Sequence, residues 1–320
     1  MGDNGSPLFN RRLLLRSSAA GAALPLVPDL AGAAAANPAV PASDAVFRWL
    51  GTSGWRIDIA GRTVLFDPYI TRFDTGLFRG PGKFDPHTPL TVDEGLVARN
   101  AGDPELVLVS HSHWDHLNDV PFIAASTQAR IVGTETTYHL LKALGVDATR
   151  IVVVKGGEVL DFGGYVVEVV SSRHSRNAGF GYFAPGTLGG RPQGGRPRTI
   201  SDLPEGDTLA FQVSVDGGPA AFLMGASDFS ARDAAGLRPD VAMVAVPTST
   251  STHRYVPRLL ETLGFPGTVV PVHWDNFELP WEKGPQRDPS VDWDGFMAQV
   301  GAAAPHTRIL TPDYLTPCRF

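Results

Sequence analysis

The chain has 320 residues, of which 43% are hydrophobic and 19% are charged, and its formal net charge is −6. This composition provides enough apolar material for a sizeable core and excludes wholesale disorder, and the acidic balance excludes a strongly basic nucleic-acid-binding protein, so we expect no nucleic-acid partner. The single cysteine, Cys318, excludes an intramolecular disulfide and a cysteine-rich zinc module.

The first 36 residues are typical of an export signal. Arg11 and Arg12 precede a stretch rich in leucine and alanine, and a run of small residues ends at Ala36. This order predicts a twin-arginine signal peptide over residues 1–36 and a periplasmic, cell-surface or extracellular mature protein; the alternative is an unstructured basic tail. The apolar part is short and broken by prolines, so we expect no transmembrane anchor. Residues 37–45, rich in alanine and proline, predict a linker.

Short apolar runs separated by turn residues predict many strands and few helices. The predicted strands are 47–50, 55–59, 63–67, 106–109, 130–132, 151–154, 165–170, 209–215, 220–224, 241–246 and 268–272. Helical patterns cover 91–100, 135–144 and 256–263, and long loops are expected over 71–90 and 176–207. We interpret residues 46–320 as one domain with two sheets and helices outside them.

A cluster of metal-binding residue types follows the apolar run that ends at Val109. His111, His113, Asp115 and His116 fall within six residues. Imidazole and carboxylate groups are common ligands of zinc and similar ions. Because one short segment cannot wrap all four side chains around one ion without strain, the spacing predicts two adjacent metal sites.

Three further candidates follow other predicted strands. His174, Asp228 and His273 are each the first histidine or aspartate after an apolar run. Side chains at the ends of neighbouring strands can meet at one edge of a sheet, so these residues are candidates to complete the two sites.

The motif His-x-His-x-Asp-His, followed by a spaced His, Asp and His, resembles the metallo-β-lactamase fold superfamily of hydrolases. The resemblance covers residues 46–315 and implies an α+β fold, a four-layer αββα sandwich with metals at one edge of the sheets. The step Asp67-Pro68 and the ending His273-Trp274-Asp275-Asn276-Phe277 look most like the branch of ascorbate phosphate lactonase-like proteins and N-acylphosphatidylethanolamine phospholipase D.

The resemblance implies a role for each matching residue. One metal would be held by His111, His113 and His174, the other by Asp115, His116 and His273. Asp228 would bridge both metals. Asp67 would orient the metal-binding histidines; its alternative role is a cap of local backbone. The absence of a cysteine before the bridging position excludes a thiolate ligand, and His113 stands where oxygen-reducing di-iron relatives have glutamate, which favours hydrolysis.

These roles predict a hydrolase with two divalent ions, with zinc expected and manganese or iron left open. Paired metals make hydroxide available near neutral pH, and Asp115 would orient this nucleophile or accept a proton. A phosphodiester is the leading substrate, and a lactone or amide is the alternative. A catalytically silent module that binds a metal or ligand is the alternative from another class.

Several residues near the predicted ligands have two interpretations each. His253 is a candidate to donate a proton to the leaving group or to bind a phosphate with Arg254; its alternative is a surface histidine. Trp114, Trp274 and Phe277 are pocket walls or ordinary core aromatics. Asp275 and Asn276 are placed to orient His273 or to touch substrate. The loop 176–207 carries Arg176, Arg191, Arg196 and Arg198, which suit a small-molecule or lipid substrate with an anionic group or form a solvated surface. The sequence carries no signal for an oligomeric state.

Overall fold

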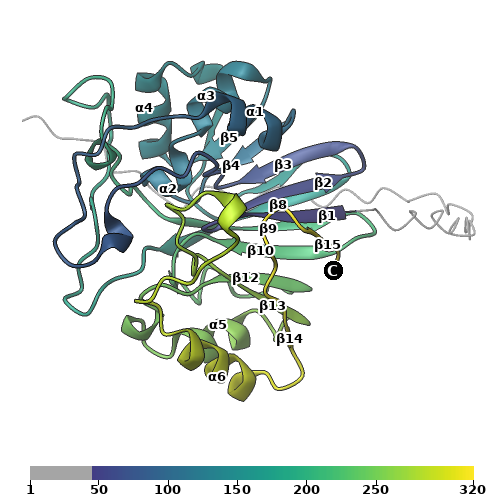
Figure 1. Ribbon diagram of the computed structural model, residues 1–320. Coiled ribbons are helices and arrows are strands. Elements are labelled where there is room, and N and C mark those ends of the chain that lie inside the picture. The colour runs from purple at the N-terminus through teal and green to yellow at the C-terminus, as the bar shows by residue number, and fades with distance from the viewer. Residues whose placement is uncertain (1–44) are drawn as a thin grey trace, which may run out of the picture. The chain divides into compact units, whose positions relative to one another are not determined.

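Two β-sheets lie face to face between outer helices (Figure 1). The computed structural model describes residues 45–320. The predicted signal over residues 1–36 and almost all of the predicted linker lie outside the described residues. Ala45, the last residue of that linker, is the first residue of a strand.

The first sheet has an antiparallel half and a parallel half. Its strand order is β15-β1-β2-β3-β4-β5-β6. Pairing is antiparallel from β15 to β3 and parallel from β3 to β6. The strands are β1 (Ala45–Gly51), β2 (Gly54–Ile59), β3 (Arg62–Phe66), β4 (Leu106–Leu108), β5 (Arg130–Gly133), β6 (Ile151–Val153) and β15 (Pro317–Cys318).

The second sheet repeats this arrangement. Its strand order is β11-β8-β9-β10-β12-β13-β14, and β7 also pairs with β8. Pairing is antiparallel among β7 to β11 and parallel from β10 through β14. The strands are β7 (Val159–Asp161), β8 (Tyr165–Arg173), β9 (Leu209–Val215), β10 (Ala220–Met224), β11 (Asp228–Phe229), β12 (Val241–Ala245), β13 (Thr268–Val272) and β14 (Arg308–Ile309).

Helices cover the outer face of each sheet. In Figure 1, α1, α3 and α4 lie over the first sheet, and α5 and α6 lie over the second. The α-helices are α1 (Glu94–Ala101), α2 (Trp114–Leu117), α3 (Val120–Ser126), α4 (Glu135–Leu144), α5 (Tyr255–Thr262) and α6 (Trp293–Ala303). Short 3-10 turns are η1 (Leu77–Arg79), η2 (Ala148–Arg150), η3 (Ile200–Asp202), η4 (Ser249–Ser251) and η5 (Trp281–Lys283).

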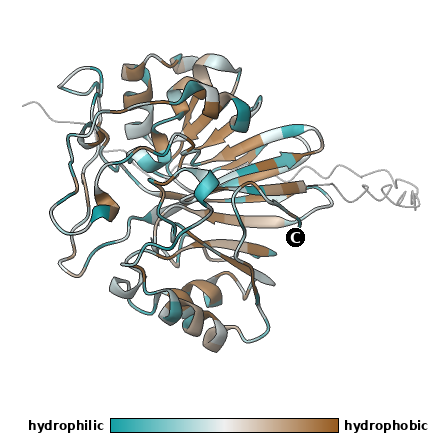
Figure 2. Cartoon of the chain, viewed as in Figure 1, coloured by the Kyte–Doolittle hydropathy of each residue, from teal (hydrophilic) through white to brown (hydrophobic). Residues whose placement is uncertain are grey.

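The buried side chains form two apolar clusters that match these layers. One fills the space between the sheets and extends under α5 and α6, with Phe47, Phe211 and Phe296 fully buried. The other lies between the first sheet and its helices, with Leu65 and Leu140 fully buried. Figure 2 shows the same distribution, with apolar residues concentrated on the strands. Such burial contributes about 25 cal/mol for each Å² of apolar surface removed from water.

The predicted α+β sandwich of four αββα layers is confirmed. Helix 135–144 has the predicted bounds, while the helix predicted over 91–100 begins three residues later and ends one residue later, as α1. The pattern did not predict α2, α3 and α6. Between residues 45 and 320, no helix combines the length and hydropathy needed to cross a bilayer.

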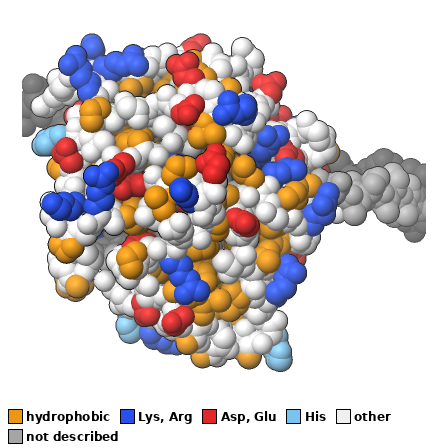
Figure 3. All heavy atoms as spheres, viewed as in Figure 1, with side chains coloured by type: hydrophobic (Ala, Val, Ile, Leu, Met, Phe, Trp, Pro, Cys, Tyr) orange, Lys and Arg blue, Asp and Glu red, His pale blue; other side chains and the backbone are white. Residues whose placement is uncertain are grey.

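The two predicted long loops, 71–90 and 176–207, contain little regular structure beyond η1 and η3. Figure 1 shows that both lie at the same side of the sheets as α2. On the face shown in Figure 3, acidic and basic side chains are interspersed rather than gathered in one stripe.

Candidate metal centre

Six predicted ligand residues come together in two groups of three. In each group, one potential ligand atom per residue lies within 4.8 Å of the others. The groups are His111, His113, His174 and, beside them, Asp115, His116, His273. The ring centroids of His111 and His116 are 3.9 Å apart, so the two groups adjoin.

Strand ends from both sheets position these side chains. The segment 110–117 follows β4 of the first sheet, and His174 and His273 follow β8 and β13 of the second. The carboxyl ends of β4, β8 and β13 lie at one edge of the two sheets. Ligands of open α/β sheets also bind at the carboxyl ends of strands. Four of the six residues, from His111 to His116, have at most 5% of their surface exposed.

Hydrogen bonds fix three of the rings through Nδ1. This atom of His111 lies 3.0 Å from the Ser110 hydroxyl. In His174 it lies 2.7 Å from the carbonyl of Ser175, and in His116 2.8 Å from Oδ2 of Asp67. Each contact leaves Nε2 to face the centre, which is the usual arrangement around metal-binding histidines.

Asp67 acts as the predicted orienting group. One carboxylate oxygen accepts the Ser110 backbone N–H at 2.7 Å, and the other accepts the hydroxyls of Ser110 and Ser53 at 2.6 and 3.0 Å. Its contact with His116 Nδ1 therefore belongs to a buried network. Gly225, directly after β10, packs on this network: a Cβ there would clash with the Ser110 hydroxyl and lie 2.7 Å from Oδ2 of Asp67.

Burial keeps one group of histidines neutral. Desolvation lowers the pKa of His113 to about 4 and of His174 to about 3. It also lowers the pKa of His111 well below its ordinary value, and the neighbouring histidines add to that shift. Neutral imidazole is the form that binds metal, so this group is ready to act as ligand without losing a proton.

The other group carries charge. Burial alone would lower the pKa of His116, but the carboxylates of Asp115 and Asp67 outweigh it and raise the pKa to about 10. Burial likewise opposes the ionisation of Asp115, yet His116 and His273 hold its pKa well below the usual range. Oδ2 of Asp115 lies 3.1 Å from Nε2 of His273 and 3.4 Å from Nε2 of His116. The Asp115 carboxylate therefore sits between two imidazoles.

The donor set fits divalent metal ions. Five imidazoles and one carboxylate are the nitrogen and oxygen ligands that zinc, manganese and iron accept. Among the described residues, Nε2 of His111 is buried without a hydrogen-bond partner. A buried polar atom without a partner is costly, and a metal ion would supply one.

Asp228 lies outside both groups, so the predicted bridging role is corrected. It is the first residue of β11, which pairs with the end of β8. Its Oδ1 accepts the backbone N–H of Phe229 at 2.8 Å and lies 3.5 Å from the Arg258 guanidinium. The strand end at the centre instead presents Gly225 and Ala226, which have no ligand atom in their side chains.

His253 is also placed away from the centre. It lies between η4 and α5, is exposed to solvent, and is absent from the residues that line the cavity beside the histidines. The prediction that it donates a proton to the leaving group is therefore corrected to a surface histidine. Asp115, the other predicted catalytic residue, lies within the second group.

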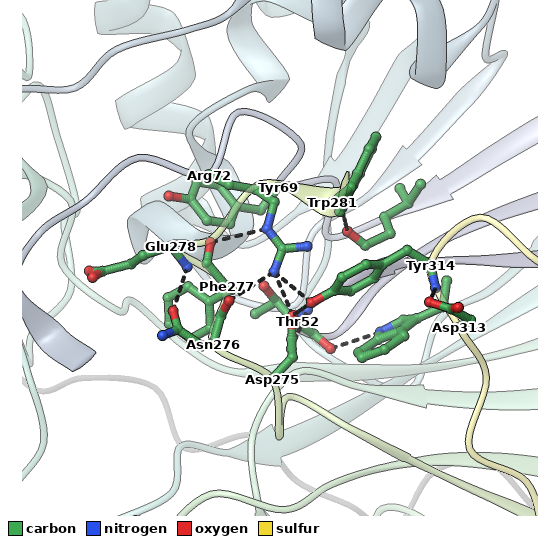
Figure 4. Close-up of polar contacts among 12 residues, drawn as sticks. Thr52, Tyr69, Arg72, Asp275, Asn276, Phe277, Glu278, Trp281, Asp313 and Tyr314 are labelled. Carbon is green, nitrogen blue, oxygen red and sulfur yellow. Dashed lines mark hydrogen bonds and ion pairs between the residues drawn. The ribbon is translucent and has the colours of Figure 1, made fainter. Parts of the chain in front are cut away.

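A buried network that the sequence did not reveal supports His273 (Figure 4). Oδ2 of Asp275 accepts from Arg72 at 2.7 Å and from the Tyr314 hydroxyl at 2.7 Å. Oδ1 of Asp275 accepts the Thr52 backbone N–H at 2.9 Å, and the Thr52 carbonyl accepts the His273 backbone N–H at 2.7 Å. The orienting role proposed for Asp275 is thus seen in the contacts.

The same region has backbone strain. Thr52, Asp67, Arg72 and His273 have φ values of 52°, 41°, 57° and 61°, in the left-handed region that favours glycine. Each such residue costs of order 1–3 kcal/mol and persists only where its surroundings enforce it. The Arg72–Asp275 network supplies that enforcement at the backbone that carries His273.

A cavity of about 670 Å³ opens over the two groups. Both long loops contribute to its apolar wall, which is formed by Leu77, Phe78, Phe84, Trp114, Phe183 and Phe277. Trp114 and Phe277 are therefore pocket walls as well as buried aromatics, while Trp274 packs in the core between the sheets. Within residues 45–320, the lining of this cavity contains no lysine or arginine.

A second, more polar cavity of about 720 Å³ lies behind His174 and Tyr182, which line both spaces. The two rings stack with centroids 4.6 Å apart. Arg176 lines this second cavity, together with Arg173 and Lys155. The other three arginines predicted as a basic lid line neither of the two cavities.

Comparison with known families agrees with this geometry. The model of the family described as "Beta-lactamase superfamily domain" matches residues 46–273, which carry all six candidate ligands. The chain belongs to this superfamily. The superfamily match ends at His273, so the second group lies wholly within the matched part.

Curated relatives of this superfamily are called UPF0173 metal-dependent hydrolases. One from Methylocella silvestris is 30% identical over 127 residues, 40% of this chain and 47% of that protein, so the aligned chain spans about half of it. One from Roseobacter denitrificans is 23% identical over 273 residues, 85% of this chain and 98% of that protein. The solved structure of Igni18, a metallo hydrolase from Ignicoccus hospitalis, shares the fold with a TM-score of 0.55 and 18% identity, covering 86% of this chain and 98% of its own.

Proposed function

We propose that the protein is a metal-dependent hydrolase that uses two adjacent divalent ions, with zinc as the expected metal. The observation that carries this proposal is the pair of three-residue ligand groups that adjoin at the base of one cavity. Bound there, the ions would supply an activated water and would polarise the oxygen of the bond to be cleaved. The relatives named as metal-dependent hydrolases support the same reaction class.

Different residues of this chain would orient the imidazoles, handle the proton and exclude water. Ser110, Asp67 and the Ser175 carbonyl hold three imidazoles in fixed orientation. Asp115, ionised between His116 and His273, is placed to accept a proton or to orient the nucleophile. The wall of Trp114, Phe183 and Phe277 would exclude water from the far side of the substrate.

The cavity favours an uncharged carbonyl compound, a lactone or an amide, with an apolar substituent. Its wall is largely aromatic and, among the described residues, contains no lysine or arginine that would bind a phosphate group. A phosphodiester, the leading expectation from the sequence, is the second candidate, because positive metal ions would themselves attract its oxygens. A lipid could enter either class through an apolar chain.

Purified, zinc-loaded protein tests this choice with three substrates: an acyl-chain lactone, an aryl amide and an aryl phosphodiester. The Asp115→Asn variant is the blank. We expect turnover of a lactone or amide that disappears in the variant. Turnover of the phosphodiester alone would overturn the carbonyl assignment. No turnover from a protein with two ions bound would favour the catalytically silent module.

Export by the twin-arginine route is part of the proposal and is supported by the sequence of residues 1–36. The route carries folded proteins, so the metal would be acquired before export. Fusing residues 1–40 to a folded reporter tests this. The reporter should leave the cytoplasm, and Arg11→Lys with Arg12→Lys should retain it; export that persists in the double variant would indicate a general secretory signal.

A further inference from the structure

The two ligand groups are poor in negative charge. Their six side chains include one carboxylate, that of Asp115, and five imidazoles. This inference rests on the proposed function, in which two divalent ions are bound. The two ions carry a charge of +4 and the Asp115 carboxylate carries −1, so the formal charge of the ions and the six ligand residues would be 4 − 1 = +3. Uncompensated charge in a buried site carries a large desolvation cost.

The carboxylates outside the two ligand groups offset that charge only in part. Asp288 is the other carboxylate that lines the cavity, and its two oxygens accept the backbone N–H and the hydroxyl of Ser290, both at 2.8 Å. Asp228 is turned toward Arg258. Asp67 is engaged by His116 and two serine hydroxyls, one step away from the ions.

The end of β10 is where the chain approaches the centre without providing a ligand. Gly225 is packed against Ser110 and Asp67, which contact His111 and His116. The next residue, Ala226, lines the cavity together with all six ligand residues and is 4% exposed. Ala226, whose side chain is only a methyl group, therefore lines the cavity at a position where a carboxylate would neutralise part of the charge.

We propose that a small external oxyanion, a carboxylate or phosphate, completes this centre by binding beside Ala226 and that it raises the affinity for the second metal ion. The anion occupies the cavity space that the side chain of Ala226 leaves open. By linkage, metal and anion raise each other's affinity by the same factor. Hydrolysis of a lactone or amide releases a carboxylate, so a product of the proposed reaction belongs to the same chemical class and is expected to be retained.

Metal titration of the metal-free protein tests this without measuring activity. Zinc is titrated calorimetrically in a sulfonate buffer, alone, with acetate, and with inorganic phosphate. We expect two ions per chain and about tenfold tighter binding of the second ion when an anion is present. The acetate and phosphate arms show which oxyanion is preferred. Equal affinity for the second ion with and without either anion would overturn the inference.

Substitution at Ala226 gives the matched pair. Ala226→Asp supplies a carboxylate, so the second ion should bind tightly without added anion and the anion effect should disappear. Ala226→Asn has nearly the same shape without the charge and should keep the anion effect. If Ala226→Asp does not fold, the inference is still tested by the affinity of the unaltered protein for the second zinc ion with and without anion. A protein that takes up no second ion under any of these conditions would instead overturn the two-ion proposal on which the inference rests.

Discussion

The guanidinium of Arg72 lies 2.7 Å from the carboxylate of Asp275, two residues after the metal-ligand candidate His273. Their side chains are 2% and 0% exposed, so the pair is fully removed from solvent. Arg72 also lies over the ring of Tyr314, with 4.5 Å between its guanidinium carbon and the ring centroid. Through Thr52, this pair holds the strained backbone that carries His273.

Removing one partner of this pair should be costly. Arg72→Met leaves the Asp275 carboxylate buried without its cation, and breaking such pairs costs about 3–5 kcal/mol. We expect that loss of unfolding free energy in chemical denaturation, together with weaker zinc binding at the His273 group. Arg79→Met is the control, because the Arg79–Asp74 pair is 68% and 43% exposed and should contribute little. Equal effects of the two variants would contradict a positioning role for Arg72.

Asp228→Ala should leave metal content unchanged, because its carboxylate faces Arg258 and not the ligand groups. Asp115→Ala should lower it, because Asp115 provides the anionic ligand of its group. Metal per chain is measured by elemental analysis after dialysis. Loss of metal from Asp228→Ala comparable to that from Asp115→Ala would restore the bridging assignment that the structure corrects.

Gly225→Ala should disturb the centre although it adds one methyl group. The new Cβ would clash with Ser110 and press on Asp67, which orients His116. Overpacking of this kind costs about 1–3 kcal/mol, and we expect a lower melting temperature and weaker zinc binding. Gly301→Ala in α6 is the matched control, since nothing lies within 4 Å of its added Cβ. A normal zinc affinity in Gly225→Ala would show that the network tolerates the methyl.

The metal-free protein should be most stable near pH 6.5. In the folded state the pKa values of His113 and His174 are lowered to about 4 and about 3. Below about pH 6.5 the unfolded chain therefore binds more protons than the folded protein, and the free energy of unfolding falls as the pH decreases. Above it, the folded state keeps the proton of His116, whose pKa is raised to about 10, and stability falls as pH rises toward that value.

Denaturant titrations of the metal-free protein across pH measure this profile. The double variant His113→Gln with His174→Gln should make the acidic limb shallower, with the remaining slope due to His111 and Asp115, and should keep the alkaline limb. Bound zinc should remove the alkaline limb, because it displaces the proton of His116, and should steepen the acidic limb, because protons compete with the metal for the imidazoles. A metal-free stability that keeps rising well above about pH 7 would contradict the raised pKa of His116.

His253→Ala should leave turnover and zinc binding unchanged, because His253 is exposed and lies outside the cavity lining. His174→Ala should impair both, since His174 belongs to the first ligand group. The same lactone or amide assay reports both variants. A large loss of turnover in His253→Ala with full metal content would return this residue to the reaction.

Six of the seven residues predicted from the sequence as metal ligands come together in the structure, and the reason is physical. His111, His113, Asp115 and His116 are neighbours in sequence. His174 and His273 follow β8 and β13, and both residues reach the same edge although β8 pairs with antiparallel neighbours. The prediction for Asp228 was wrong because the direction of a side chain depends on how its strand pairs. β11 pairs with β8, with Asp228 opposite Arg173, and the Asp228 carboxylate lies near Arg258 of α5. An apolar run locates a strand end but not the register of the short strand that follows.

The support beneath His273 depends on contacts between distant parts of the chain. Arg72 and Asp275 are 203 residues apart, and Thr52 and Asp275 are 223 apart. No periodicity in the sequence links these residues, and the positive φ values of Thr52 and Arg72 follow from tertiary contacts and not from residue type. The long loops 71–90 and 176–207 were visible as loops, but their joint aromatic wall required the fold.

The first ligand group takes residues from two different sheets. His111 and His113 follow β4, and His174 follows β8. One ion held by all three residues would cross-link the two sheets at the edge where β4 and β8 end. It would close a chain loop of more than sixty residues. The chain has one cysteine and cannot form an intramolecular disulfide, so the ion would provide the kind of cross-link that a disulfide provides in other proteins. Chelation should then let the two sheets separate first at this edge, which hydrogen exchange at the ends of β4 and β8 would report.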